Sequence, residues 1–203
     1  MKIGILNYNT GNLKSVEAAL NNFGINSIII NSKIDFDRVD ILILPGVGSF
    51  NRAMSYIDEM DFRELILKFS KNKFILGICL GYQILFEESD ESPGVKGLGL
   101  IEGSIKKIIT KNKKLKIPHT GWNNIEIVKN GKLLDQVHSN ELFYFVHSYY
   151  ASIKDPRIIT SNFYHGSKFC SSIENDNIYG MQFHPEKSGR QGLKIYENLI
   201  NLI

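Results

Sequence analysis

Short apolar runs alternate with amphipathic segments of helical spacing over the first 90 residues of this 203-residue chain. The apolar runs are typical of buried strands and cover residues 2–7, 27–31, 39–44 and 74–78. The segments with helical spacing cover residues 13–23, 51–57, 62–71 and 80–88. Parallel strands need long crossover connections, which helices supply, so this order indicates a parallel sheet with helices on both faces.

After Gly103 the pattern favours strands joined mostly by short turns. The expected strands cover residues 103–109, 124–128, 142–150, 158–164, 168–173 and 179–183, and an amphipathic helix over 192–203 follows them. The chain contains no internal repeat and no linker rich in proline, glycine or serine. We therefore expect one domain over residues 1–203. Its fold class would be α/β, a three-layer open and mostly parallel sheet with antiparallel strands in the C-terminal half.

The composition, with 43% hydrophobic and 22% charged residues, is that of a folded soluble protein. Its net charge of +3 is too small to indicate a nucleic-acid or membrane partner. The N-terminus turns polar too early for a signal peptide, and no apolar run approaches the roughly 20 residues that span a bilayer. We therefore expect a cytoplasmic protein, whose two cysteines, Cys79 and Cys170, form no disulfide in that reducing compartment.

One dense basic run, residues 106–116, has two interpretations. Its lysines would suit a phosphate-binding patch. Charge runs more often only solvate a surface, and β-like runs flank the turn-like centre KNKK. We interpret the run as a solvated hairpin.

Two glycine-bearing turns follow consecutive strands of the expected parallel sheet. They are PGVGSF, residues 45–50, and GICLGYQ, residues 77–83. Ligands of open sheets bind beyond the C-terminal ends of the strands. The two turns should therefore lie side by side, and this edge is the candidate site.

Cys79 stands in the second turn between glycines at positions −2 and +2. A sharp strand-to-helix turn strains its central residue and lifts the side chain above the sheet. A Cβ at Gly77 or Gly81 would collide with neighbouring backbone, and the helix dipole favours the thiolate form of Cys79. The backbone N–H of Leu80 would point to the place where an oxyanion forms. The alternative is a buried cysteine that packs as a small apolar side chain.

A nucleophilic cysteine needs a base, and the base needs an orienting group. In GMQFHPEKS, proline favours an extended conformation at His184, so the imidazole and the Glu186 carboxylate can point to the same side. The preceding strand would carry His184 to the edge that holds Cys79. Alternatively, His184 begins a surface loop and Glu186 pairs with Lys187.

The remaining histidines fit this role less well. His147 is expected in a core strand or a pocket wall, and three more lie in turn-like segments without a carboxylate at i+2: His119, His138 and His165. Two cysteines 91 positions apart, without paired histidines, do not make a zinc site. The chain also lacks the glycine-rich lysine loop that binds nucleotide phosphates. We expect neither metal nor cofactor.

Three motifs, PGVGSF, ICLGYQ and HPE, together resemble the class I (triad) glutamine amidotransferases. Within that family, the amino-acid sequences of several segments are most similar to those of glutaminase subunits that serve histidine biosynthesis. These segments are PGVGSF, FEESDESPGVKGLG, PHTGWN, FVHSYY and GMQFHPEKS. The resemblance extends from the first strand to near the last helix.

The resemblance implies hydrolysis of L-glutamine through a thioester on Cys79, with His184, held by Glu186, as proton carrier. It also implies an oxyanion site formed by backbone N–H groups of Leu80, Gly46, Val47 and Gly48. The substrate-binding residues that it implies are Gln83, Glu91, Ser148 and Tyr149. For Glu91, the alternative is an exposed acid within the polar run EESDES.

The released ammonia would go to another protein, because glutaminase elements occupy this chain throughout. The resemblance implies a (β/α)8 barrel cyclase that forms a heterodimer with it. Candidate interface residues by family position are Asn12, Trp122, Asn123, Tyr144 and Lys187, although Trp122 could instead serve the core.

Asn7 stands where many relatives carry aspartate, which leaves open a paralogous glutaminase that feeds a different synthase, for example one that forms an amidino sugar. Two further functions would fit the same fold: a stand-alone thiol hydrolase and a non-catalytic binding module.

Overall fold

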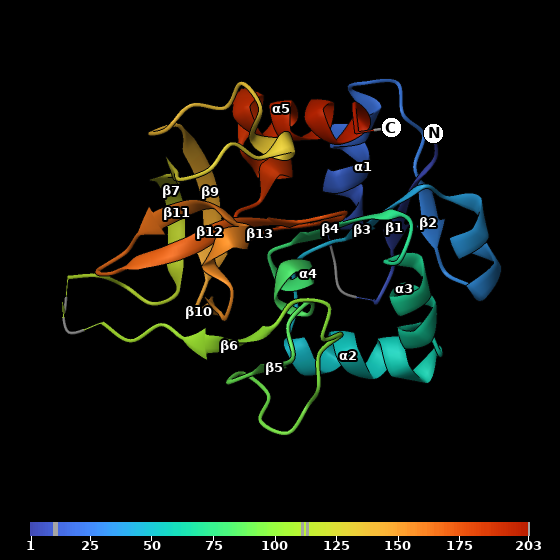
Figure 1. Ribbon diagram of the computed structural model, residues 1–203, viewed down its shortest axis with the longest axis horizontal. Coiled ribbons are helices and arrows are strands. Elements are labelled where there is room, and N and C mark those ends of the chain that lie inside the picture. Colours follow the sequence, from blue (N-terminus) through green and yellow to red (C-terminus); the bar gives the residue numbers. More distant parts are fainter. Residues whose placement is uncertain (10–11, 111, 113, 203) are drawn as a thin grey trace.

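The computed structural model describes residues 1–9, 12–110, 112 and 114–202. Its main sheet has the strand order β2-β1-β3-β4-β13-β12-β11-β8 (Figure 1). In that order the strands are Ile28–Ile30, Ile3–Leu6, Ile41–Leu44, Phe74–Ile78, Ile178–Met181, Lys168–Asn175, Ile159–Tyr164 and Glu126–Ile127. The pairs from β2 to β13 are parallel, and those from β13 to β8 are antiparallel. The expected α/β class, with antiparallel strands late in the chain, is confirmed.

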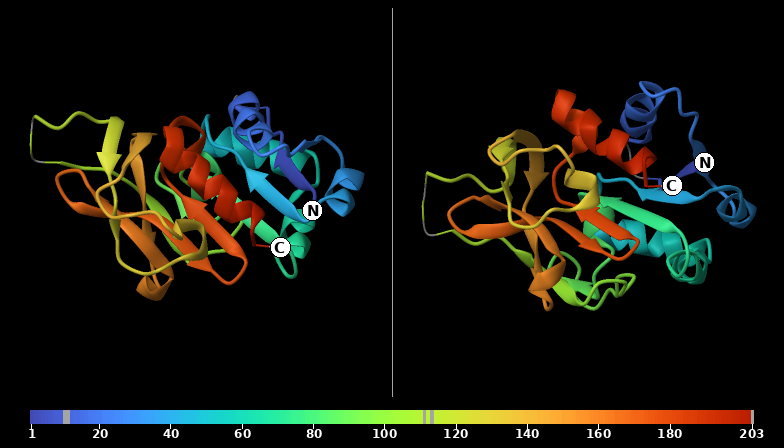
Figure 2. Two further views of the ribbon diagram at one scale, coloured as in Figure 1. Left: turned by 90° about the horizontal axis from the view of Figure 1, so that it is seen from above. Right: turned by 45° about the horizontal axis from the view of Figure 1, so that its top comes forward.

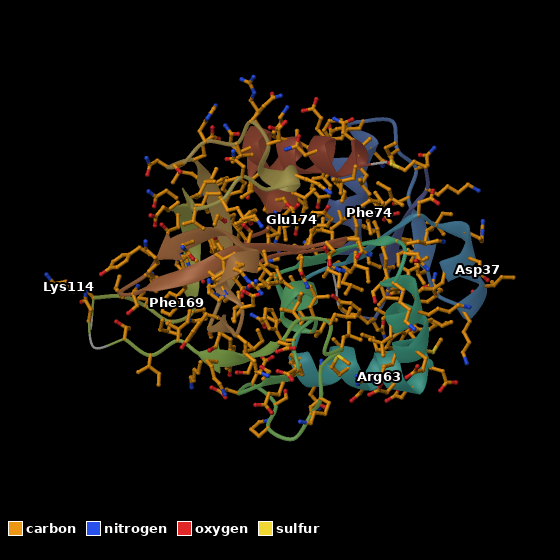
Figure 3. All side chains as sticks on the ribbon, viewed as in Figure 1. Asp37, Arg63, Phe74, Lys114, Phe169 and Glu174 are labelled. Atoms are coloured by element: carbon orange, nitrogen blue, oxygen red, sulfur yellow. The ribbon has the colours of Figure 1, made fainter. Side chains whose placement is uncertain are left out.

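Helices cover both faces of this sheet, as the alternating pattern predicts (Figures 1 and 2). Helices α1 (Leu13–Asn21) and α5 (Gly189–Ile200) lie on one face, and α2 (Phe50–Glu59) and α3 (Arg63–Phe69) lie on the other. Alternate side chains of β3 supply the two cores: Ile41 and Ile43 pack with α1 and α5, and Leu42 and Leu44 pack with α2 and α3. Side chains fill the space on both sides of the sheet (Figure 3).

The parallel pair β4–β13 positions the candidate site. Gly77 lies opposite Gly180, and Ile78 opposite Met181, so the two strands end at the same level. The ladder continues one residue further, because the backbone N–H of Cys79 donates to the carbonyl of Met181 at 2.8 Å. Segments about 100 residues apart in sequence are thereby joined at one edge.

Two smaller sheets flank this edge. One contains β10 (Tyr149–Ile153), β6 (Gly103–Lys107) and β5 (Glu88–Ser89), and the other pairs β7 (His119–Asn124) with β9 (Leu142–His147). The single strand expected over residues 142–150 is therefore interrupted at Ser148, where the chain passes from one small sheet to the other.

The helix expected over residues 80–88 is too long. Helix α4 covers only Leu80–Gln83. The next carbonyls accept hydrogen bonds from a distant loop: Ile84 O from Leu98 N, Leu85 O from Leu100 N and Phe86 O from Gly99 N. These tertiary bonds replace the helical ones, so the chain turns toward β5.

The hairpin expected over residues 106–116 is also wrong. Strand β6 pairs with β10 and β5, whereas the strand that follows the basic run, β7, pairs with β9. Residues 111 and 113 of this run lie outside the described residues, as does residue 203 at the end of the expected helix 192–203. That helix, α5, begins earlier, at Gly189.

A buried amide fixes α5 on the sheet. The Asn198 side chain is 7% exposed, and its Nδ2 donates to the carbonyls of Leu133 at 3.0 Å and Asp135 at 2.8 Å. These carbonyls belong to the 3₁₀ turn Lys132–Leu134 and the residue after it. The amide thus joins the last helix to a segment more than 60 residues earlier.

Replacing Asn198 with alanine should lower the free energy of unfolding by about 2 kcal/mol, because a buried carbonyl and a partly buried one lose their donor. Urea unfolding followed by circular dichroism measures this change. The matched control is Asn201→Ala at the exposed end of the same helix, where less than about 0.5 kcal/mol is expected. Equal losses in both variants would contradict the assignment.

Candidate active site

Cys79 occupies a strained turn between β4 and α4. Its φ of 49° lies in the left-handed region, which a side chain adopts only when the surroundings enforce it. A Cβ on Gly77 would lie 2.6 Å from the carbonyl oxygen of Gly81, and one on Gly81 would overlap the carbonyl oxygen of Leu44. Both glycines are therefore needed sterically, as the sequence pattern predicts.

His184 follows β13 and is held at both its backbone and its side chain. Its N–H donates to the Tyr144 carbonyl at 2.9 Å, and its carbonyl accepts from Ser188 Oγ at 2.6 Å. Its Nδ1 lies 2.7 Å from Glu186 Oε1, and both side chains are fully buried. Since a carboxylate only accepts, Nδ1 carries the proton and Nε2 is left for a reaction partner. Within the described residues, Nε2 has no hydrogen-bond partner.

The charges around His184 favour its protonated form. Burial alone lowers the pKa of His184, but the nearby Cys79 sulfur and Glu186 carboxylate more than offset this effect and raise the pKa to about 10. The structure therefore brings the three predicted catalytic side chains into one electrostatic unit. This arrangement favours the protonated form of His184, which lies between the Cys79 sulfur and the Glu186 carboxylate.

Asn12 contacts this unit directly. Its Nδ2 donates to Glu186 Oε1 at 2.5 Å, from the residue that precedes α1. The backbone of Asn12 is left-handed, with φ of 97°, so its placement costs strain. Its amide lies against the buried carboxylate beside His184, and the interface position that the resemblance implies for Asn12 stays a prediction.

Gln182 is a functional candidate that the sequence patterns did not reveal. It is fully buried, and its Nε2 lies 3.6 Å from Cys79 Sγ, where a donor stabilises a thiolate. Its Oε1 accepts from Gln83 Nε2 at 3.1 Å, so the Gln83 side chain holds the Gln182 amide in place beside the sulfur. The available signal was one polar residue within the apolar run IYGMQF.

A cavity of about 260 Å³ opens over Cys79. Every residue predicted for the oxyanion site and for substrate binding lines it: Gly46, Val47, Gly48, Leu80, Gln83, Glu91, Ser148 and Tyr149. Pro118, Val146 and His147 complete the wall. The location of His147 satisfies both expectations for it, because it ends a strand and lines the cavity.

The PGVGSF turn reaches Cys79 through a close backbone approach. A Cβ on Gly46 would overlap the Ile78 carbonyl oxygen and lie 2.8 Å from the Cys79 Cβ. Gly48 has φ of 128°, which favours glycine. The turn therefore lies directly beside the sulfur-bearing residue, as expected from the two adjacent strand ends.

Glu91 is half-buried rather than an exposed acid. Its Oε2 accepts from the backbone N–H of Phe50 at 2.8 Å, at the first residue of α2. The carboxylate thus faces the positive end of a helix and lines the cavity at the same time.

Aromatic and basic side chains form an exposed surface beside His184. Trp122 is 55% exposed, which excludes a core role, and its ring meets Tyr144 edge-on at 6.0 Å. Lys187 Nζ lies 5.8 Å from the centre of the Tyr144 ring. We refer to Trp122, Tyr144 and Lys187 as the aromatic surface. Asn123, the neighbour of Trp122, instead donates to His119 and to the Tyr164 carbonyl.

Two absences hold for the part of the chain that the structure describes. Its helices are too short or too polar for any of them to cross a bilayer. No group of three or more histidine, cysteine or acidic side chains there is arranged to hold a metal ion.

Comparison with known proteins gives one consistent result. The family model "Glutamine amidotransferase class-I" matches residues 5–202. The chain is 44% identical to imidazole glycerol phosphate synthase subunit HisH of Methanocaldococcus jannaschii, over 99% of this chain and 100% of that protein. It is 42% identical to subunit HisH 1 of Campylobacter jejuni, over 98% and 100%. A crystal structure of a glutamine amidotransferase shares the fold, with a TM-score of 0.78 at 16% identity, covering 100% of this chain and 98% of the other.

The raised pKa of His184 predicts how the stability depends on pH. A raised histidine pKa contributes stability in full below the unfolded value of about 6.5, and this contribution is lost as pH rises toward 10. Glu186→Gln removes one of the charges that raise this pKa. The difference in unfolding free energy between the native chain and this variant should therefore be largest near pH 6 and shrink toward pH 10.

Urea unfolding at pH 6, 8 and 10 measures that difference. A matched control is Glu197→Gln, which removes an exposed carboxylate on α5 and should give a small difference at every pH. A Glu186→Gln difference that stays constant or grows with pH would show that His184 is not held in its charged form.

Proposed function

Because this chain belongs to the class-I glutamine amidotransferases, we propose that it is the glutaminase subunit of an imidazole glycerol phosphate synthase in histidine biosynthesis. The observation that carries the proposal is the buried His184–Glu186 pair, which lies beside a strained cysteine at the floor of a small cavity. The HisH subunits that match it along almost its whole length support the choice of branch.

In the first step, the Cys79 thiolate attacks the side-chain amide carbon of L-glutamine. The C–N bond breaks as His184 donates its Nε2 proton to the leaving nitrogen, so ammonia departs and a thioester remains. In the second step, His184 accepts a proton from water as that water attacks the thioester carbon. Glutamate leaves and the thiolate returns. Glu186 keeps the imidazole in the tautomer that both steps require.

The oxyanion of each tetrahedral intermediate would lie between two backbone segments. Leu80 begins α4, so its N–H has no partner within that helix. The Gly46–Gly48 turn, which abuts Cys79 and also lines the cavity, offers further N–H groups. Each donor would contribute about 3 kcal/mol to the transition state.

The remaining cavity residues fit the polar ends of glutamine. The Glu91 carboxylate suits the α-ammonium group, and the backbone N–H groups of Ser148 and Tyr149 suit the α-carboxylate. Gln83 would support the reacting end through Gln182. This chemistry requires neither a metal nor a cofactor.

Ammonia must reach its acceptor without release into water, where it would be protonated. We propose that a (β/α)8 barrel cyclase binds over the active-site edge and forms a heterodimer with this chain. The exposed aromatic surface lies beside His184, and its Trp122 and Tyr144 are of the residue types enriched at protein interfaces. We also propose a cytoplasmic location and one amidotransferase domain over residues 1–203.

A paralogous glutaminase that feeds a different synthase is the second candidate. Some relatives carry numbered names, such as HisH 1 of Campylobacter jejuni and HisH 2 of Vibrio vulnificus, which fits copies with separate partners. Reconstitution with the histidine-pathway cyclase from the same organism distinguishes the two. Formation of imidazole glycerol phosphate from glutamine supports the first proposal, and its absence together with full glutaminase activity beside another barrel supports the second.

An electrophilic glutamine analogue should label Cys79 and leave Cys170 unmodified. Burial raises the pKa of the Cys170 thiol to about 12, so this second cysteine stays protonated and unreactive. Mass spectrometry after peptide digestion reads the labelled site. Cys79→Ser should abolish labelling, whereas Cys170→Ser, the matched control, should retain it. Labelling that persists in Cys79→Ser would contradict the assigned nucleophile.

The isolated chain should turn over glutamine at least about tenfold more slowly than its complex with the cyclase. The physical reason is the glycine-flanked Gly46–Gly48 turn, whose peptides can rotate an N–H away from the oxyanion until a partner fixes them. Glutamate release with and without the cyclase measures the difference. Full turnover by the isolated chain would contradict this, and peptide hydrolysis without glutamine turnover would favour a stand-alone thiol hydrolase.

A further inference from the structure

Two histidines and an asparagine form a continuous hydrogen-bonded chain between an outer strand and the cavity. His119 Nδ1 lies 3.1 Å from His147 Nε2, where β7 and β9 place the two residues opposite each other. His147 Nδ1 lies 2.7 Å from the carbonyl oxygen of Tyr149. At the other end, Asn123 Nδ2 lies 3.1 Å from His119 Nε2 and 3.0 Å from the Tyr164 carbonyl oxygen. We refer to Asn123, His119 and His147 as the imidazole chain.

With both rings neutral, only one arrangement of protons satisfies this chain. The Tyr149 carbonyl can only accept, so His147 carries its proton on Nδ1 and accepts at Nε2. His119 must then donate from Nδ1 and accept at Nε2. The Asn123 amide supplies that last hydrogen and uses its second one on Tyr164. The three hydrogen bonds from Asn123 through His119 and His147 to Tyr149 therefore all donate toward the cavity.

The surroundings keep both rings neutral. His119 stacks on Phe163, with ring centres 5.3 Å apart, and also packs against Phe145 at 5.0 Å. Burial lowers the pKa of His147 to about 3 and that of His119 to about 4. Neutral rings in an apolar setting hold fixed tautomers, so the hydrogen bonds that they make are directional.

The inner end of the chain fixes a corner of the cavity wall. His147 ends β9, Tyr149 begins β10, and Ser148 between them is where the polypeptide changes sheets. The His147 ring holds the Tyr149 carbonyl, and the backbone N–H of Ile108 donates to the Ser148 carbonyl at 2.9 Å. The Ser148 carbonyl shares a peptide group with the Tyr149 N–H, so its hydrogen bond sets the direction of that N–H, while the His147 ring fixes the peptide group that follows Tyr149.

We propose that His119 and His147 are positioning residues, anchored by Asn123, that hold the Ser148–Tyr149 corner in the geometry that binds the α-carboxylate of the substrate. This inference rests on the proposed function, because it assigns a role within the glutamine site. Neither imidazole reacts. Each acts through the corner, so its removal should weaken recognition of the carboxylate and leave recognition of the amide intact.

Equilibrium binding by titration calorimetry tests this, in chains that also carry Cys79→Ala so that no turnover occurs. The ligands are L-glutamine and 4-aminobutanamide, which keeps the amide and the amine but lacks the α-carboxylate. His119→Phe keeps an aromatic ring against Phe163 and removes both nitrogens. His119→Asn places an amide donor where Nδ1 lies and serves as the conservative rescue.

His119→Phe should raise the Kd for glutamine about tenfold, and His119→Asn should return it to within about threefold. The Kd for 4-aminobutanamide should change less than twofold in both variants.

Asn123→Ala, which leaves both buried rings in place, should raise the Kd for glutamine about threefold. This variant tests the role of the imidazole chain even if His119→Phe folds poorly. His165→Phe is the matched control: its ring packs 4.3 Å from His119, but its Nε2 bonds the Lys116 carbonyl, so no change is expected.

An unchanged glutamine Kd in both His119→Phe and Asn123→Ala would overturn the inference, as would equal losses for the two ligands. Equal losses in His119→Asn and His119→Phe would show a packing role rather than a hydrogen-bonding one. Failure of the Cys79→Ala parent to bind glutamine at all would be a different result, because it would overturn the proposed function itself.

Discussion

Parallel pairing between β4 and β13 is the constraint on which the site depends. The two strands end at the same level, and the Cys79 N–H extends their ladder by one bond. Sulfur and imidazole, 105 residues apart in sequence, thereby meet without a long loop having to find its place. The strained turn at Cys79 is tolerated because the sheet, buried under helices on both faces, holds it there.

Charge is the second organising feature. A fully buried carboxylate is costly unless it is paired and hydrogen-bonded, and Glu186 has both His184 and Asn12 on one oxygen. Its negative charge, together with the nearby Cys79 sulfur, raises the pKa of His184 and so holds a proton on it. The same arrangement that makes the buried acid tolerable therefore prepares the proton that a departing amine needs.

Much of this arrangement is predictable from the sequence, and the reasons are local. Apolar runs and helical spacing report burial, so they reveal the alternating first half and the strand that leads to His184. Two glycines around a cysteine, and a proline after a histidine, restrict the backbone at their own positions. Such signals predict the α/β class and the sheet edge that holds the candidate site, and the residues of the motifs indicate the family.

The features that the sequence does not reveal depend on contacts between distant segments. Helix α4 ends early because the loop around Leu98 takes its next carbonyls. Strand β7 is defined by its pairing with β9, since the glycine and the two asparagines of HTGWNN weaken its strand pattern, and the local sequence therefore places His119 in a turn. Gln182 resembles one more strand residue. Hydrogen bonds between segments that are distant in sequence leave no recognisable pattern within either segment.

Close packing around Cys79 also limits which parts of this fold can change to accept a new substrate. Gly46, Gly77 and Gly81 each abut backbone, so none of them can accept even a methyl group without displacing its neighbours. Variation that leads to other amides as substrates must therefore come from other segments of the cavity lining, such as those that carry Glu91, Pro118 and Ser148. The residues packed around Cys79 stay constant while those segments can diverge.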